Sequence, residues 1–453
     1  MIRRVRRREF LAEAGALSLA IAVPSAAGGG DVDALLAPWT GPYGGLPPFD
    51  KVHVEAFSPA LREGMEMERV EIAAIARNPA PASFENTIVA LENVGRPLRR
   101  VRSLFNTYSG TMNVGPMRAL ETEMSPVLAA FGDEIVQNGA LFARVKAVYD
   151  ARENAGLTPE QQRLATVVYD RFARQGAALD AAHKSRLAQI NQQLARLYTT
   201  FSQNQLADEE GYTLMLERPE DLAGMPESLR ASAARAAAEH GRPGAWAITN
   251  TRSSMEPFLT YASRRDLREK GWRMWIMRGD NAGAHDNKPV ITQIMQLRAE
   301  KATLLGHPTY AHWITAANMA KTPDAAMALM MQVWPAAVAR VHQEVADMQA
   351  VVDAEHGGFN IAPWDYRYYA EKVRKAKYDL DQDEVKGYLQ LEKIREGMFG
   401  LPASSTASSS SLRPTCRCIR RTCACTRCAG PGPVSACGIS IRTLATARRP
   451  ARG

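Results

Sequence analysis

Cysteine is missing from the first 415 residues of this 453-residue chain. This long part therefore contains neither a disulfide nor a thiolate metal site. All six cysteines lie in a short C-terminal segment, at Cys416, Cys418, Cys423, Cys425, Cys428 and Cys437. From Leu401 to Gly453 the chain also has nine arginines but no lysine, aspartate or glutamate. Composition thus separates this tail from the body that precedes it.

The body also lacks an excess of basic charge. The net charge of the whole chain is +8, which by itself suggests an anionic partner. The tail supplies +9 of this charge and residues 1–27 supply +3, so residues 28–400 carry −4. A mildly acidic body has no electrostatic signature of nucleic-acid binding. We therefore expect no nucleic-acid partner.

A long hydrophobic run is missing beyond the first 27 residues. Within them, Arg7-Arg8-Glu9-Phe10-Leu11 resembles the twin-arginine export signal. An apolar stretch from Ala12 to Val23 follows, and Ser25-Ala26-Ala27 offers a cleavage site. We interpret residues 1–27 as a twin-arginine-type signal peptide, which predicts a periplasmic or secreted protein with no membrane contact beyond export. A basic N-terminal tail or an anchor helix is the alternative.

The body is predicted to be mostly α-helical, because it is rich in good helix formers. Thr158-Pro159-Glu160-Gln161 is typical of a capping box with proline at the first helical position, and predicts helical structure from there to about Ala207. Two strand-like segments, Tyr212–Leu216 and Ala245–Thr249, predict a small sheet. An apolar stripe within the helical stretch indicates core packing: Leu187, Ile190, Leu194, Leu197 and Phe201. Helix starts or loops are predicted at Pro289, Pro308, Pro323 and Pro363.

Eight short segments carry a resemblance to a known family. In chain order they are Pro47-Pro48-Phe49-Asp50, Phe84–Glu92, Pro257–Tyr261, Leu267–Lys270, Arg278–Asn281, Leu297–Ala302, Met319–Pro323 and Lys377–Asp381. Together they resemble the N-terminal portion of the thimet-oligopeptidase family of zinc metallopeptidases, and most of all its bacterial peptidyl-dipeptidase (dipeptidyl carboxypeptidase) branch. The resemblance covers roughly residues 45–400.

The resemblance implies a mostly α fold, with an elongated helical body, a small β element and a deep channel. A zinc ion on the channel wall is implied, with short unfolded peptides as substrates and release of C-terminal dipeptides. It divides the chain into an N-terminal helical domain at 28–245 and the start of the peptidase catalytic domain at 246–400. Neither substrate preference nor oligomeric state follows from it.

The residues for that chemistry are missing. A zinc peptidase of this type needs the His-Glu-x-x-His pattern, which places two imidazoles on one helix face beside a glutamate base. The chain contains no His-Glu dipeptide. His307 and His312 are five residues apart, and His342-Gln343-Glu344 lacks a second histidine. We expect surface or packing roles for all eight histidines, which are His53, His183, His240, His285, His307, His312, His342 and His356.

No catalytic, cofactor-binding or metal residue is therefore assigned. The sequence predicts a body truncated before the zinc-binding helix, and an inactive fragment with uncovered apolar surfaces and poor solubility. The rival hypothesis is a periplasmic peptide-binding or scaffolding protein that lost the chemistry.

The tail from about Leu401 to Gly453 permits two interpretations. Its cysteine spacing is typical of a metal or disulfide module. Reading its codons at one shifted offset, however, permits strand-like strings; Ala436 to Arg442 would permit Leu-Trp-Tyr-Phe-Asp-Pro. We therefore interpret residues 401–453 as an out-of-frame translation, expect the segment to be disordered, and expect its cysteines to have no designed chemistry.

Overall fold

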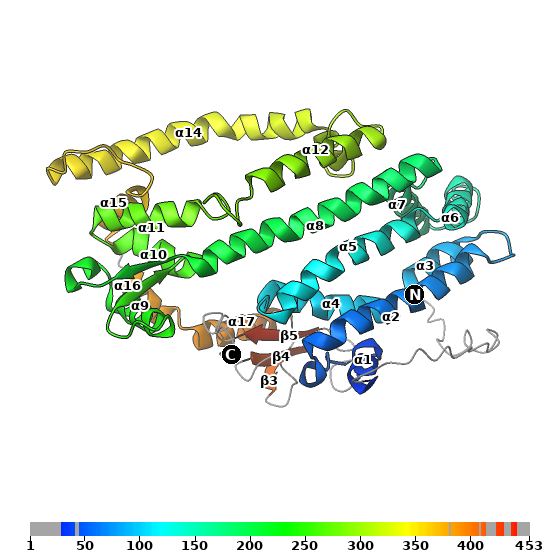
Figure 1. The fold of residues 1–453 in the computed structure, drawn as a ribbon, viewed down its shortest axis with the longest axis horizontal. Coiled ribbons are helices and arrows are strands. Elements are labelled where there is room, and N and C mark those ends of the chain that lie inside the picture. Colours follow the sequence, from blue (N-terminus) through cyan, green and yellow to red (C-terminus); the bar gives the residue numbers. More distant parts are fainter. Residues whose placement is uncertain are drawn as a thin grey trace.

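The computed structural model describes residues 29–40, 45–379, 382–406, 409–413, 423–429 and 436–441. Most of these residues are helical and form an elongated body, which confirms the predicted mostly α fold (Figure 1). In the part that the structure describes, none of the helices combines the length and the apolar character that crossing a membrane requires. The expected signal peptide at 1–27 lies outside the described residues.

The N-terminal helices pack around an aromatic core. Phe57 contacts Phe105 and Tyr108 edge-to-face, with ring centroids 5.9 and 5.4 Å apart. Such contacts add to the stabilisation from burying the rings. The elements of this region are α1 (Gly29–Leu36), η2 (Phe49–Lys51), α2 (Val54–Ala76), η3 (Phe84–Val89), α3 (Ala90–Asn93), α4 (Arg96–Thr111), α5 (Pro116–Val136) and α6 (Gly139–Ala151).

A long central helix, α8 (Ala181–Gly211), follows α7 (Pro159–Arg174) and packs against α5 on one side and α12 (Lys288–Leu304) on another. The predicted capping box of α7 is present, since Gln161 N donates to Thr158 Oγ1 and Thr158 N donates to Gln161 Oε1. The predicted apolar stripe lies in the core: Leu187, Ile190 and Leu194 are buried, and Ile190 and Leu194 pack with residues of α12.

The small predicted sheet is confirmed. Strands β1 (Thr213–Leu216) and β2 (Trp246–Thr249) pair antiparallel, with Thr213 opposite Thr249 and Leu216 opposite Trp246. Between them lie η4 (Pro219–Leu222) and α9 (Glu227–Glu239). Strand β1 lies in the predicted N-terminal domain (28–245), and β2 lies at the start of the predicted catalytic domain (246–400). The sheet therefore joins these two regions. The division into domains stays a prediction.

The second half of the body contains the longest helix, α14 (Pro323–Ala354), which runs along one edge of the molecule (Figure 1). Thr322 caps α14 by accepting a hydrogen bond from Ala325 N at 3.1 Å. Pro289 and Pro323 lie in the first turn of α12 and α14, as predicted. The other helices are α10 (Arg252–Tyr261), α11 (Arg265–Ile276), α13 (Tyr310–Thr315), α15 (Tyr366–Tyr378), α16 (Gln382–Tyr388) and α17 (Leu391–Thr406).

Three strands are described in the tail, where disorder was expected. They are β3 (Ser409–Arg413), β4 (Cys423–Ala429) and β5 (Ala436–Ile441), paired antiparallel in that order. Threonine and isoleucine, which favour extended backbone, occur in β4 and β5 and give a physical reason for this difference. The out-of-frame origin of the tail stays a prediction, and Cys416 and Cys418 lie outside the described residues.

Candidate functional site

The eight histidines are spread over the surface. Six of them are exposed, and His307 and His312 are half-buried. His183 Nδ1 lies 2.6 Å from Asp180 Oδ2, and His312 Nδ1 lies 2.8 Å from Thr309 Oγ1, the cap of α13. Both contacts are local to the start of a helix.

Glu344, which follows His342 in the incomplete His342-Gln343-Glu344 match, has structural partners. Glu344 on α14 accepts hydrogen bonds from Tyr366 Oη at 2.9 Å and from Arg340 Nε at 3.1 Å. Burial, and then the contact with Glu344, raises the pKa of Tyr366 above its ordinary value. The hydroxyl of Tyr366 therefore stays protonated and donates to Glu344, whose carboxylate helps to join α14 to α15.

The described residues do not fit a zinc site. Within them, no three histidine, cysteine, aspartate or glutamate side chains are grouped closely enough to hold a metal ion. A catalytic zinc needs three such protein ligands converging on one point. No step of peptide hydrolysis is therefore derived from the residues of this structure.

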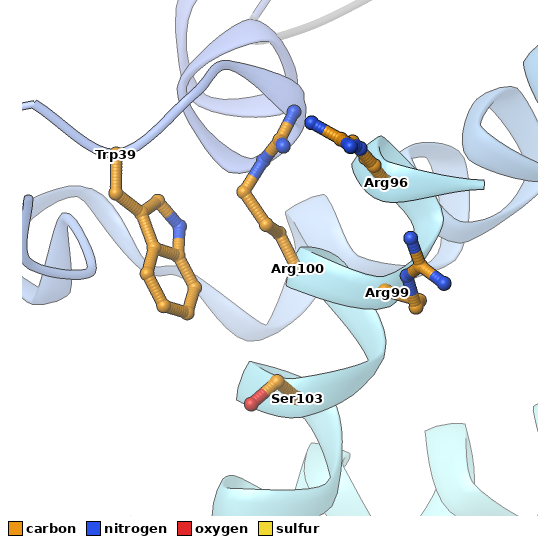
Figure 2. A pocket seen from close by; sticks show the side chains of 5 residues that line it. All are labelled: Trp39, Arg96, Arg99, Arg100 and Ser103. Atoms are coloured by element: carbon orange, nitrogen blue, oxygen red, sulfur yellow. The ribbon is translucent and has the colours of Figure 1, made fainter. Parts of the chain in front are cut away.

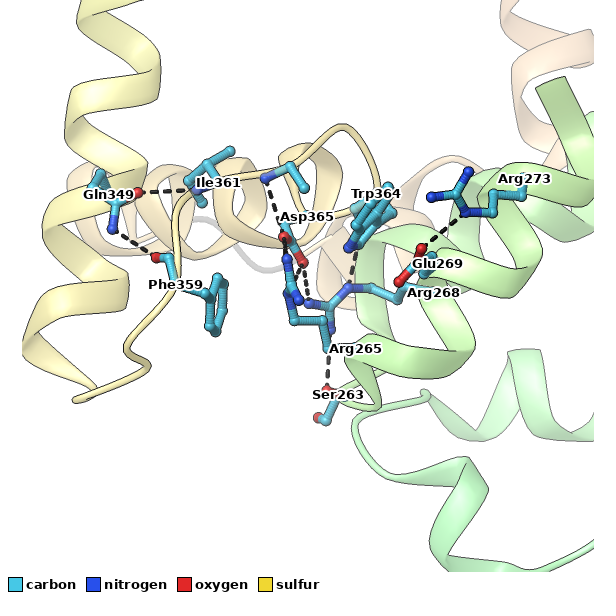
Figure 3. Close-up of polar contacts among 11 residues, drawn as sticks. Ser263, Arg265, Arg268, Glu269, Arg273, Gln349, Phe359, Ile361, Trp364 and Asp365 are labelled. Carbon is cyan, nitrogen blue, oxygen red and sulfur yellow. Dashed lines mark hydrogen bonds and ion pairs between the residues drawn. The ribbon is translucent and has the colours of Figure 1, made fainter.

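A buried ion cluster joins α11 to the loop before α15. Asp365 is fully buried, and its carboxylate lies between the guanidinium groups of Arg265 and Arg268 (Figure 3). Arg268 Nη2 donates to Asp365 Oδ1 at 2.8 Å, and Arg265 Nη2 donates to Oδ2 at 2.9 Å. Arg268 also donates from Nη1 to Ala262 O at 2.9 Å. The charges are thus paired and hydrogen-bonded, which a buried ion cluster requires.

A second polar network fixes the end of α8. Asp208 Oδ2 accepts from Gly279 N at 2.7 Å and from Asn281 Nδ2 at 2.8 Å. Gly279 has a φ of +74°, and an added Cβ would lie 2.6 Å from Asn287 Nδ2. Only glycine adopts this backbone there without strain. The Arg278–Asn281 segment, noted in the sequence without a role, is therefore a turn that joins the long central helix to α11 and α12.

A third network lies where α5, α8 and α12 meet. Lys301 Nζ donates to Asn191 Oδ1 at 2.6 Å, and Asn191 Nδ2 donates to Asp133 Oδ1 at 2.6 Å. Burial raises the pKa of Asp133 to about 6, although the hydrogen bond from Asn191 and the charge of Lys301 lower it. Burial also lowers the pKa of Lys301, which Asp133 partly opposes. In the sequence, Lys301 was noted only as a member of the Leu297–Ala302 segment that carries the family resemblance. No sequence pattern pointed to Asp133.

A surface hollow of about 430 Å³ lies between α4 and the end of α1 (Figure 2). Its lining includes Arg96, Arg99 and Arg100 from α4, and Trp39. Arg100 donates to the backbone oxygen of Leu36, and burial together with Arg96 lowers the pKa of Arg100. Guanidinium groups can hold an anion. Ser103 also lines the hollow, but the lining residues include no histidine or carboxylate that could act as its base. The hollow lies on the other side of the body from α14 (Figure 1).

Comparison with known proteins gives a consistent set of relatives. Residues 258–404 match the model of peptidase family M3. The chain is 40% identical over 354 residues to the dipeptidyl carboxypeptidase of Escherichia coli (strain K12), covering 78% of this chain and 52% of that protein. It is 37% identical, with the same coverage, to the dipeptidyl carboxypeptidase of Salmonella typhimurium. Oligopeptidase A of Salmonella typhimurium is 29% identical over 358 residues.

These matches are partial for the relatives. The chain spans about half the length of the curated relatives that it matches, since 52% of each of these three proteins is covered. The match to the family model ends at residue 404, in the last turn of α17 and close to Leu401, where the composition changes.

Proposed function

Because the chain belongs to peptidase family M3, we propose that its body is the supporting half of a zinc-dependent peptidyl-dipeptidase, an enzyme that releases C-terminal dipeptides from short unfolded peptides. The observation that supports this most is the 40% identity over 354 residues to a dipeptidyl carboxypeptidase. The identity to oligopeptidase A is lower, at 29%, which favours the activity named for the dipeptidyl carboxypeptidases.

The role of this half is to hold the fold and to position the catalytic part. Its polar networks at Arg268–Asp365 and at Asp208–Gly279 are buried and paired, and they tie α8, α11 and α15 into one frame. In metallopeptidases zinc polarises the scissile carbonyl and activates water. The zinc ligands belong to sequence that this chain does not contain, because it has no His-Glu-x-x-His pattern.

We further propose that the chain as given does not hydrolyse peptides, and that residues from about Leu401 onward are read out of frame. Support for the second statement comes from the tail's nine arginines without any acidic residue, and from the end of the family match at residue 404. The twin-arginine-type segment at residues 1–27 supports export to the periplasm or secretion.

The test compares two genes. The first encodes the chain as given, and the second carries the single added or dropped base near codon 400 that opens the shifted frame. Hydrolysis of a short peptide with release of its C-terminal dipeptide is measured with added zinc and after treatment with a chelator. We expect no hydrolysis from the first protein, and chelator-sensitive dipeptide release from the second.

Two results would contradict the proposal. Zinc-dependent hydrolysis by the chain as given would show that its own residues suffice. A shifted frame without His-Glu-x-x-His would remove the out-of-frame interpretation. If the chain as given binds the peptide without cleaving it, the result supports the alternative of a periplasmic peptide-binding or scaffolding protein.

A further inference from the structure

The hollow beside α4 is lined by one face of that helix. Arg96, Arg99, Arg100 and Ser103 are three and four residues apart, so their side chains share this face. The opposite face of α4 packs into the aromatic core of the N-terminal helices. The three guanidinium groups are therefore presented by a helix that the fold holds in place.

Two of these arginines are paired only with uncharged oxygens. Within the described residues, Arg96 donates to Asn93 Oδ1 and Arg100 donates to the backbone oxygen of Leu36. Arg96 is the first residue of α4, where a cation opposes the helix dipole. Like charges four residues apart also destabilise a helix. Burial and then the charge of Arg96 lower the pKa of Arg100, so the two cations are close enough to repel each other. A bound anion would offset these costs.

The carboxylates of the neighbouring helix α2 serve other groups. Glu71 Oε2 accepts a hydrogen bond from Gly95 N at 2.7 Å, just before α4. The pKa of Glu68 lies above its ordinary value, because burial and Glu71 raise it more than Arg102 and Arg99 lower it. Glu68 therefore lies near Arg99 and Arg102. The negative charge of α2 partly neutralises the Arg99 side of the face and not the other two guanidinium groups of the hollow.

Trp39 lines the hollow from the segment that follows α1. Its indole Nε1 and the Nε of Arg100 are buried donors without a hydrogen-bond partner in the part of the chain that the structure describes. Figure 2 shows the indole nitrogen on the side of Trp39 that faces Arg100, and the guanidinium groups of Arg96 and Arg100 pointing toward one another. Buried donors without a partner are uncommon and call for an acceptor.

We infer that this hollow binds a small molecule through a doubly charged oxyanion, such as a phosphate group, held between Arg96 and Arg100. Guanidinium groups donate paired hydrogen bonds to phosphate oxygens, and two cations match two negative charges. The volume of about 430 Å³ is within the range of small-molecule sites, and Trp39 supplies a flat apolar wall for the rest of the ligand. This inference goes beyond the proposed peptidase function and does not depend on it.

The experiment is a calorimetric titration of the full chain with inorganic phosphate at constant ionic strength. It is made at about pH 8, where phosphate carries nearly two negative charges. Acetate, with a single charge, is the control anion. We expect saturable one-to-one binding of phosphate and weaker binding of acetate. The melting temperature should rise with phosphate concentration, because a ligand that binds only the folded state stabilises it.

Matched variants on α4 locate the site. Arg96→Gln removes a guanidinium group of the hollow, and Arg102→Gln removes one from the same helix outside the hollow; both positions are exposed. Arg100→Lys keeps the charge but removes the planar fork. We expect Arg96→Gln and Arg100→Lys to weaken phosphate binding at least about tenfold, as loss of a charge-assisted hydrogen bond does. Arg102→Gln should match wild type, because salt screens its more distant charge.

Each outcome decides the proposal. Saturable phosphate binding that Arg96→Gln weakens and Arg102→Gln leaves unchanged supports the site. Equal loss in these two variants overturns it, because the attraction then follows net charge alone. A folded wild-type chain without saturable phosphate binding overturns it, as does acetate that binds as tightly as phosphate.

A last arm separates a free ligand from a lipid headgroup. The same variants are mixed with vesicles of phosphatidylcholine and phosphatidylglycerol, and bound protein is measured by co-sedimentation. We expect no vesicle binding that depends on Arg96. Vesicle binding that Arg96→Gln abolishes, together with no response to inorganic phosphate, overturns the free small molecule in favour of a membrane surface.

Discussion

Arg268 is 1% exposed and contacts a fully buried Asp365, so each charge depends on the other. Arg268→Ala would remove one of the two guanidinium groups that pair with Asp365 and leave Arg265 as the other, and loss of a partner from a buried ion cluster costs up to about 3–5 kcal/mol. We expect Arg268→Ala to lower the free energy of unfolding by that amount in urea titrations. Arg273→Ala is the control on the same helix, since Arg273 is 60% exposed in its pair with Glu269 and should cost less than about 1 kcal/mol. Equal losses would show that burial does not set the difference.

The contribution of Asp133 to the free energy of unfolding should depend on pH with the opposite sign to that of most carboxylates. Burial raises its pKa from 3.8 to about 6, so the folded state binds a proton more tightly than the unfolded state. The contribution of this group to stability is therefore complete below about pH 4 and is lost as the pH rises through 6. We therefore expect the free energy of unfolding of Asp133→Asn, relative to that of wild type, to rise by about 2–3 kcal/mol as the pH goes from 4 to 7.

The measurement for Asp133 is the free energy of unfolding of both proteins across that range of pH. Asp170→Asn on α7 is the control, because Asp170 is exposed. Its stability curve should run parallel to that of wild type. Parallel curves for Asp133→Asn as well would show that the carboxyl is not desolvated in the folded protein.

At the scale of single elements, local sequence patterns predicted helix ends well. Thr158 and Gln161 exchange the two hydrogen bonds of a capping box at the start of α7. We expect Thr158→Ala to cost about 1 kcal/mol of stability and to speed amide hydrogen exchange in the first turn of α7. Thr303→Ala, at an exposed position near the end of α12, should cost nothing measurable, because alanine is the better helix former. Faster exchange in α12 but not in α7 would contradict this assignment.

In the tail, the structure describes strands that the sequence pattern did not predict. Residues 409–413, 423–429 and 436–441 form paired strands, although we expected disorder in a segment that we interpret as out of frame. Strand pairing depends on partners that are distant in sequence, such as Cys423 and Ile441, so one-dimensional periodicity is a poor guide to it.

For the whole molecule, the uneven charge distribution predicts that the tail and the body differ in their affinity for polyanions such as DNA. All nine tail arginines follow Thr406, the last residue of α17, whereas residues 28–400 carry −4. We expect any affinity of the full chain for duplex DNA, measured by gel shift, to fall steeply between 50 and 200 mM salt, as phosphate contacts do. A chain ending at Thr406 should show none. Salt-resistant binding by the shortened chain would refute the exclusion of nucleic acid as a partner of the body.

Residue patterns alone determined the helical class, the capping box at Thr158, the strand pair around residues 213 and 249, and the lack of a zinc motif. These features depend on near neighbours in the chain, or on the simple presence of residues. Only the tertiary structure decided that Asp208 holds the turn at Gly279, that Asp133 lies desolvated beside Asn191, and that the middle of α14 is uncovered. Burial and pairing of a charge depend on which helices meet in space, and that information is spread over segments about 60 to 110 residues apart.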